Sequence, residues 1–195
     1  MNKLQGFYVL QNSNLPSVPW KKYYGNDEFD PNILWTVRSA VKDGDDFHLP
    51  RKVGVSANEA KEFASELYKK LGTEDMVIFY PYFIALKSGV IDITNKRVVI
   101  EAVKNDLWNL VTNNKTDVTI IFEADDLRII GDEYFLSQDE LVTLIEYCKL
   151  IKKKFSQEIN IGKNVILEWS FANKSNISKQ AIGDTKLVFY EIRTV

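Results

Sequence analysis

Three charged residues stand inside apolar runs that have the composition of β-strands. Arg38 lies in Val-Arg-Ser-Ala, Glu101 in Val-Ile-Glu-Ala and Glu168 in Ile-Leu-Glu-Trp. A charge inside a buried strand needs a partner, because desolvating it alone is costly. Carboxylates in such positions can hold Mg²⁺ against the phosphates of a nucleotide, and an arginine can clamp those phosphates. Arg193, in Glu-Ile-Arg-Thr near the end of the chain, is a fourth candidate.

Two interpretations of these four residues are open. In the first, Arg38 and Arg193 contact a phosphorylated ligand, and Glu101 and Glu168 hold Mg²⁺. In the second, the arginines pair with the glutamates as structural ion pairs, or some of the four face solvent. Residue types alone favour the second interpretation, because structural ion pairs also gather charges in strands.

Other site chemistries find little support. The sequence has no Gly-x-x-x-x-Gly-Lys-Ser/Thr phosphate loop and no Gly-x-Gly-x-x-Gly turn. With one cysteine and one histidine it has no cluster typical of structural zinc. Cys148 falls on an apolar helix stripe and is expected to be a small buried hydrophobe. His48 is expected in an exposed loop.

Composition limits the partners. The net charge of −2 and pI near 5.6 give no basic surface for nucleic acid. No apolar run approaches the roughly 20 residues that span a bilayer, and the first ten residues do not resemble a secretory signal. We therefore expect a cytoplasmic protein that binds neither nucleic acid nor membranes. Its 195 residues suffice for one domain, which could consist of two lobes, 1–86 and 87–195.

Two helices are predicted with clear start signals. Ser56 with Glu59, and Ser137 with Glu140, each form a Ser-x-x-Glu capping box. The apolar spacing after each box predicts amphipathic helices over about 57–71, with Gly72 as a stop, and 138–155.

The remaining apolar runs predict strands. The predicted strands are 5–10, 34–41, 76–86 with an edge or bulge at Pro81, 90–93, 97–102, 116–123, 127–130, 164–172 and 185–194. Irregular segments are expected at 12–31, from 42 to Gly54, at a Ser88-Gly89 turn, at 104–114 (as a short helix or a loop) and around 173–183. Strands that cluster rather than alternate with helices indicate an α+β fold with a mainly antiparallel sheet.

The order of these pieces resembles the nucleotide-binding domain of the phosphoenolpyruvate synthase and pyruvate phosphate dikinase family. The matching segments are 37–40 (VRSA), 87–90 (KSGV), 99–102 (VIEA), 167–169 (LEW) and 191–194 (EIRT), where the family reads VRSS, SGV, VIEA, IEW and QxRP. The resemblance covers about residues 34–195. It implies an ATP-grasp-like fold that holds ATP and Mg²⁺ between two lobes. Arg38 would then contact the phosphates, with Glu101 and Glu168 near the metal.

The sequence also departs from the family. The glycine-rich segment with a phosphate-contacting lysine is missing, and Asn105-Asp106-Leu107-Trp108 replaces the GLGE turn, where Asp106 is a conceivable substitute carboxylate. Glu191 and Thr194 replace the glutamine and proline of QxRP. The chain stops where the family's phosphohistidine domain would begin. A complete dikinase reaction is therefore not expected of this chain alone.

Two functions remain open at this stage. The first is a stand-alone, degenerate relative of the dikinase ATP-binding domain that binds a nucleotide or phosphorylated ligand with little or no catalysis. The second is a non-enzymatic interaction module, or a subunit of a split phosphotransferase, that kept the fold and lost the ATP site. The aromatic residues Trp20, Tyr23, Tyr24 and Phe29 could cover a vacated cleft or dock a partner, although packing of a long loop is the simpler explanation.

Overall fold

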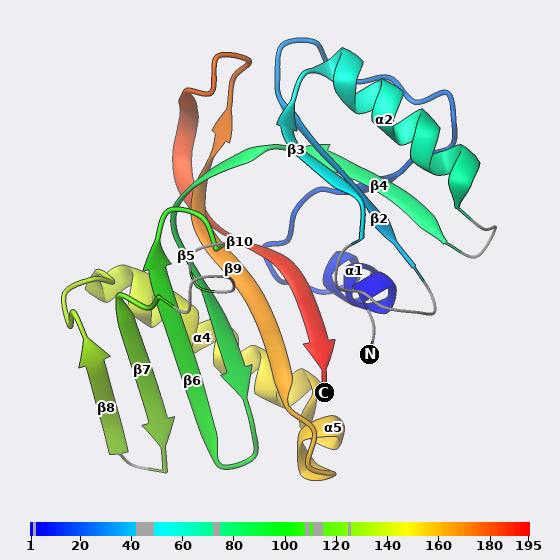
Figure 1. The fold of residues 1–195 in the computed structure, drawn as a ribbon. Helices are drawn as coiled ribbons and strands as arrows, with labels where there is room; N and C mark the ends of the chain where they lie inside the picture. The colour runs from blue at the N-terminus through cyan, green and yellow to red at the C-terminus, as the bar shows by residue number, and fades with distance from the viewer. Residues whose placement is uncertain (2, 42–48, 72–74, 108–109, 111–114, 125) are drawn as a thin grey trace. The chain divides into compact units, whose positions relative to one another are not determined.

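The computed structural model describes residues 1, 3–41, 49–71, 75–107, 110, 115–124 and 126–195. The chain divides into two compact units (Figure 1). Unit 1 consists of Met1, Ala85–Phe171 and Phe189–Val195, and unit 2 of Asn2–Ile84 and Ala172–Val188. The sequence suggested one boundary after residue 86, whereas here residues 172–188 belong with the N-terminal segment.

The expected α+β class with antiparallel strands is confirmed, but the strands form two sheets. In unit 2 the sheet has the order β1-β4-β2-β3. Its strands are β1 (Lys21–Lys22), β2 (Trp35–Ala40), β3 (Arg51–Val55) and β4 (Met76–Pro81), and the three pairings are antiparallel. The predicted Arg38 strand is thus a buried inner strand.

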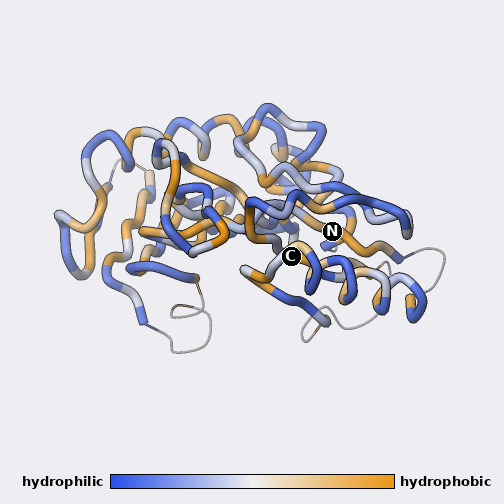
Figure 2. Tube along the Cα trace, turned by 90° about the horizontal axis from the view of Figure 1, so that it is seen from above, coloured by the Kyte–Doolittle hydropathy of each residue, from blue (hydrophilic) through white to orange (hydrophobic). Residues whose placement is uncertain are grey.

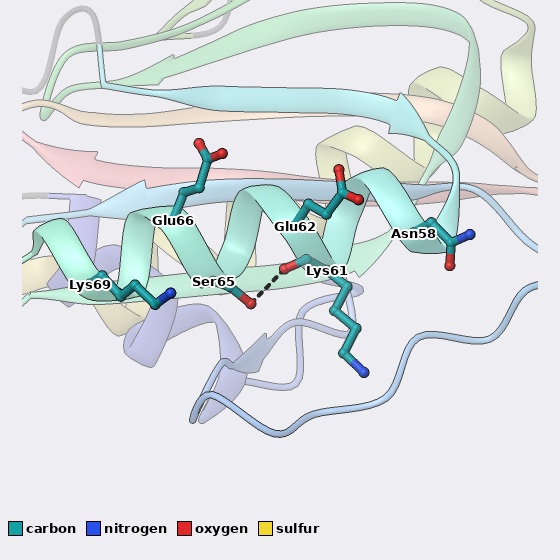
Figure 3. Close-up of a pocket in the computed structure, with 6 residues that line it drawn as sticks. All are labelled: Asn58, Lys61, Glu62, Ser65, Glu66 and Lys69. Carbon is teal, nitrogen blue, oxygen red and sulfur yellow. Dashed lines mark hydrogen bonds between the residues drawn. The ribbon is translucent and has the colours of Figure 1, made fainter.

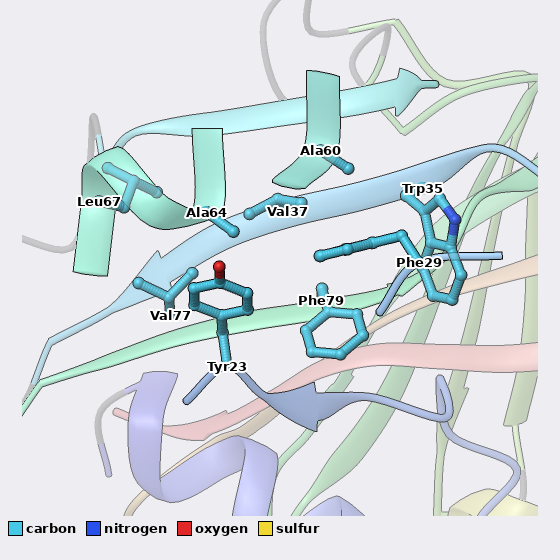
Figure 4. Packing of buried hydrophobic residues seen from close by; sticks show 9 residues of the cluster. All are labelled: Tyr23, Phe29, Trp35, Val37, Ala60, Ala64, Leu67, Val77 and Phe79. Atoms are coloured by element: carbon cyan, nitrogen blue, oxygen red, sulfur yellow. The ribbon is translucent and has the colours of Figure 1, made fainter. Parts of the chain in front are cut away.

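Two helices accompany the unit 2 sheet. The predicted helix after Ser56 is confirmed as α2 (Ala57–Lys70), with both bonds of the capping box formed. Its buried Ala60, Ala64 and Leu67 pack with sheet residues and with rings from the preceding loop (Figure 4). The full cluster is Tyr23, Phe29, Trp35, Val37, Ala60, Ala64, Leu67, Val77 and Phe79.

Two predictions for unit 2 are wrong. Residues 5–10 are not a strand but part of helix α1 (Lys3–Gln11), whose buried Gly6, Phe7 and Leu10 follow helical spacing. The segment before Gly54 is not all loop, because β3 runs from Arg51 to Val55 and pairs with β2. The prediction of an edge position at Pro81 is confirmed. On the outer side of β4, strand β1 pairs only with Ile78 and Phe79 and does not extend to Pro81.

Unit 1 contains most of a sheet with the order β10-β9-β5-β6-β7-β8. Its strands are β5 (Phe83–Ile93), β6 (Arg97–Lys104), β7 (Val118–Glu123), β8 (Asp126–Gly131), β9 (Val165–Ser175) and β10 (Ala181–Thr194). The predicted hairpins β5–β6 and β7–β8 are confirmed as antiparallel pairs. Strands β5, β9 and β10 contribute residues to both units.

The predicted turn at Ser88-Gly89 is wrong, because both residues lie inside β5. A Cβ at Gly89 would lie 2.0 Å from the Glu101 carbonyl oxygen and 2.5 Å from Cζ2 of Trp169. This glycine therefore allows close packing against a tryptophan on the adjacent strand β9. In the sequence alone, such a glycine cannot be told from a turn residue.

The second predicted helix is confirmed as α4 (Gln138–Lys154), which again has a complete capping box at Ser137 and Glu140. The short helix α5 (Ser156–Asn160) follows it. The expected loop at 173–183 is shorter than predicted, because β9 and β10 extend into it and leave a turn over 176–180. Along the chain, apolar residues concentrate in the strands, and many turns are polar (Figure 2).

Candidate functional site

Arg38 lies in the middle of β2, where it is opposite Ile78 on β4 and Arg51 on β3. It is 8% exposed. The carbon at the centre of its guanidinium lies 5.4 Å from the centroid of the Phe7 ring, on helix α1. Such a cation–π contact contributes roughly 0.5–2 kcal/mol, depending on how far it is desolvated. An aromatic ring of unit 2 is thus one of the groups that accommodate the buried cation.

Arg193 and Glu168, two of the predicted site residues, are in contact in unit 1. Arg193 Nη2 lies 3.6 Å from Glu168 Oε1, and Arg193 Nε lies 3.2 Å from Oε1 of Glu191. The side chain of Glu191 is only 3% exposed, whereas those of Glu168 and Arg193 are 21% and 28% exposed. One guanidinium is therefore shared by two carboxylates. Arg193 and Glu168 thus form the ion pair that the second interpretation describes.

Glu101 lies on β6, opposite Val90 on β5 and Thr119 on β7. Directly opposite residues of an antiparallel pair point to the same face, so Glu101 shares its face with Val90 and, two residues back along β5, with Ser88. The Ser88 hydroxyl lies 2.7 Å from that of Ser170 on β9.

Glu168 is two residues before Ser170 and therefore also points to the face that carries Glu101. Strand β5 lies between β9 and β6, which separates the two glutamate backbones by about 10 Å. The two predicted metal ligands thus share one face of the sheet, one strand apart. Arg38 belongs to unit 2, so the three unit 1 candidates are grouped without it.

Asp92 is a further carboxylate on this face, in addition to the predicted site residues. It lies two residues after Val90 in β5, and its Oδ2 accepts a hydrogen bond of 3.4 Å from Nδ2 of Asn164. Its Oδ1 is buried, and no described residue donates a hydrogen bond to it. Burial raises the pKa of Asp92, an effect that Arg97 and Asn164 oppose. The sequence feature that could have revealed Asp92 is a charged residue between two isoleucines in the strand sequence Val-Ile-Asp-Ile.

We call this set of residues the acidic face: Asp92, Glu101, Glu168, Glu191 and Arg193. Within the described part of the chain, no three or more His, Cys, Asp or Glu side chains are arranged to hold a metal ion. Glu101 and Glu168 could supply two oxygen ligands to Mg²⁺, which prefers few carboxylates together with water and phosphate oxygens. A bound nucleotide would have to supply the rest.

Cys148 matches its prediction. It is buried on α4, and burial raises its pKa to about 12. A thiol with such a pKa stays protonated and is a poor nucleophile. His48, the polar turn at 42–47, the Gly72 stop, Asp125 and Trp108 lie outside the described residues.

The aromatic residues of the first loop are mostly packing residues. Trp20, Tyr23 and Phe29 are 6%, 0% and 9% exposed, whereas Tyr24 is 65% exposed. Tyr23 and Phe29 belong to the core cluster shown in Figure 4, and Trp20 packs edge-on against Phe7 of α1. The packing interpretation is therefore confirmed for these three rings.

The outer face of α2 is a hollowed but polar surface (Figure 3). Its residues are Asn58, Lys61, Glu62, Ser65, Glu66 and Lys69. Both signs of charge are interspersed, and the Ser65 hydroxyl donates to the Lys61 carbonyl oxygen of its own helix. Charges that alternate in this way are typical of a solvated helix face, not of a site for a charged ligand.

No helix among the described residues is both long and apolar enough to cross a membrane. No protein-family model matches this chain, and the comparison with curated proteins finds no significantly similar sequence. The resemblance to the dikinase family therefore rests on the five short segments alone.

Proposed function

We propose that this chain is a stand-alone, degenerate relative of the dikinase ATP-binding domain, of ATP-grasp-like fold, that binds a nucleotide or another phosphorylated ligand and has little or no catalysis of its own. The observation that carries the proposal is the grouping of Glu101, Glu168 and Arg193 on the acidic face of unit 1. These residues come from three of the five segments that resemble the family.

The α+β architecture with antiparallel sheets supports the proposal, because an ATP-grasp-like fold requires both. ATP and Mg²⁺ are the proposed ligands, with Glu101 and Glu168 as the metal's protein ligands.

Weak or absent catalysis follows from the charges. Phosphoryl transfer depends on cations placed around the transferred group. Arg193 is already shared by Glu168 and Glu191, so its charge is largely neutralised before any phosphate arrives. The sequence also lacks the phosphate-contacting lysine and the GLGE carboxylate of the family.

The same neutralised arginine favours a second candidate function, an interaction module or a subunit of a split phosphotransferase. An arginine whose charge is already neutralised by an internal ion pair attracts a phosphate only weakly. The fold would then be retained for the surface it presents to a partner protein.

A thermal-shift panel separates these two functions. The protein is heated with ATP, ADP, phosphoenolpyruvate or inorganic phosphate, each with and without Mg²⁺. A nucleotide at ten times its Kd stabilises the folded state by about 1.4 kcal/mol, which in a chain of this length raises Tm by roughly 3–6 °C. A Mg²⁺-dependent rise with ATP supports nucleotide binding. No rise with any of the four ligands at millimolar concentration contradicts it and leaves the interaction module.

A further inference from the structure

The apolar face of the unit 1 sheet consists of rows of residues that lie directly opposite one another across four strands. One row runs Ile93, Val98, Phe122, Leu127 from β5 to β8, and the next runs Ile91, Ile100, Ile120, Ile129. Opposite residues share a face, so both rows point to the same side of the sheet. Helix α4 lies on this side, because Ile145 and Cys148 of α4 line one groove together with Val98 and Phe122.

The exposure of each row rises toward β8. Ile91, Ile93 and Ile100 are fully buried and Ile120 is 2% exposed, whereas Leu127 and Ile129 are 51% and 40% exposed. Six strands span about 24 Å, but one helix is only about 10–12 Å wide. In the part of the chain that the structure describes, a single long helix therefore leaves the β7–β8 end of the face uncovered.

A groove of about 200 Å³ lies where α4 leaves this face open. Its walls are Val98, Phe122, Ile145, Cys148, Lys149 and Lys152. We call the groove, together with the exposed Leu127 and Ile129 beside it, the open corner. It is apolar on the sheet side and carries two lysines on the helix side.

The α4 side of the open corner has the spacing of a helix-packing seam. Val142, Ile145, Lys149 and Lys152 are separated by three, four and three residues, which places them in one row along α4. Val142 is 47% exposed, so the row is apolar at one end and cationic at the other. Lysine stems can pack on an apolar neighbour while their ammonium groups meet an anionic one.

We propose that the open corner binds an amphipathic helix of a partner protein, whose apolar stripe packs on Phe122, Leu127 and Ile145 and whose acidic flank faces Lys149 and Lys152. The positive charges of Lys149 and Lys152 favour an acidic partner. A second copy of this chain is a poor occupant, because α4 would meet the same lysines and the outer face of α2 is polar (Figure 3). This inference does not depend on nucleotide binding by the acidic face.

The shape of the open corner favours a helix over an acyl chain. A single acyl chain is best held in an enclosed tunnel, whereas this surface extends sideways from the groove across Leu127 and Ile129, each about half exposed. A helix laid beside α4 would cover both rows at once, as a helix on a sheet normally does.

The test uses the full chain and a synthetic 17-residue peptide, the length of α4. The peptide carries leucines at i, i+3, i+4 and i+7 spacing with glutamates elsewhere, and its binding is followed by fluorescence anisotropy. Two control peptides are a scrambled sequence of the same composition and a version with lysine in place of glutamate. We expect the acidic amphipathic peptide to bind at least about tenfold more tightly than either control.

Matched variants locate the binding. Leu127→Glu and Lys149→Glu alter exposed positions in the open corner and should each weaken binding about tenfold, with unchanged circular dichroism spectra. Leu150→Glu, on the outer side of α4 where Leu150 is 54% exposed, should leave binding unchanged.

Three outcomes would overturn the proposal. One is equal affinity for all three peptides, or binding that Leu127→Glu does not change. In another, myristate displaces the peptide, and Leu127→Glu and Lys149→Glu abolish the binding of myristate itself. That result would assign the groove to an acyl chain. The third is a dimer in sedimentation experiments that Leu127→Glu converts to monomer, which would assign the surface to a second copy.

Discussion

Arg193 Nη2 lies 3.6 Å from Oε1 of Glu168, and both side chains are largely buried in unit 1. The same guanidinium approaches the nearly buried Glu191. These contacts bring together residues from two segments that the sequence suggested as parts of one site. They also mean that the charge of Arg193 is largely neutralised within the protein.

Removal of Arg193 should destabilise the protein markedly. Arg193→Ala leaves Glu191, 3% exposed, without this cationic neighbour, and losing a charged partner costs about 1.5–3 kcal/mol. Arg128→Ala is the matched control, because Arg128 pairs with Glu123 at the surface, where such a pair contributes about 0–1 kcal/mol. Urea unfolding of both variants measures the difference. Equal losses in the two variants would show that the Glu168–Arg193–Glu191 cluster is energetically unimportant.

Gly89 should tolerate no side chain. In Gly89→Ala the new methyl group would overlap the Glu101 backbone oxygen and the Trp169 ring, and overpacking of this kind costs roughly 1–3 kcal/mol or more. Gly162→Ala provides the comparison. Its new methyl group would meet no described atom within 4 Å, so the cost comes from the positive φ of 87° and is about 1–2 kcal/mol. A Gly89→Ala protein as stable as the wild type would contradict the close approach of β5 and β9.

The two capping boxes should contribute similarly and independently. Ser56→Ala and Ser137→Ala each remove a hydroxyl that accepts from the third helical residue, at a cost of about 1 kcal/mol each. The caps lie in different units, so the double variant should lose about the sum. Chemical denaturation of the three variants tests this, and a double variant much less stable than the sum would reveal coupling between the helix starts.

Asp92 should make the folded state pH-dependent. Its pKa is raised on folding by burial, so the folded state binds its proton more tightly than the unfolded state does. The resulting stabilisation is present at pH below the unfolded value near 3.8 and is lost as the pH rises through the raised folded value.

Asp92→Asn removes this titration and should therefore raise Tm at pH 7. The increase should be at most about 2–4 °C, the shift that 1 kcal/mol produces in a chain of this length. The gain should shrink as the melting experiments move toward pH 4. A constant difference between the two proteins at every pH would mean that Asp92 is not desolvated.

The elements with strong local signals were predicted from the sequence. Both Ser-x-x-Glu boxes start helices, and strands β5 and β6 pair across the turn between 93 and 97, where the hairpin was predicted. The first helix and β3 were missed. Helix α1 is nine residues long with a glycine in it, so its local signal is weak. Strand β3 is five residues long and depends on its pairing with β2, which its own sequence does not reveal.

For the candidate site, the sequence placed Glu101 and Glu168 in strands. Alternation along each strand does not say that two strands turn the same face outward, and it is the register of β6, β5 and β9 that puts both glutamates on the acidic face. The pairing of Arg193 with Glu191 was not foreseen, because two residues at i and i+2 of a strand normally point the same way without touching so closely. Gly89 was misread as a turn residue because its reason, the Trp169 ring, lies 80 residues further along the chain.

Nucleotide binding by the acidic face of unit 1 is tested most directly by a calorimetric titration of ATP with Mg²⁺. We expect Mg²⁺-dependent heat for the wild type, and at least about tenfold weaker binding for Glu101→Gln and for Glu168→Gln. Both side chains are half-buried, so the folding of each variant is checked by its melting curve. No heat at millimolar ATP, or heat that neither variant changes, would rule out nucleotide binding at this face.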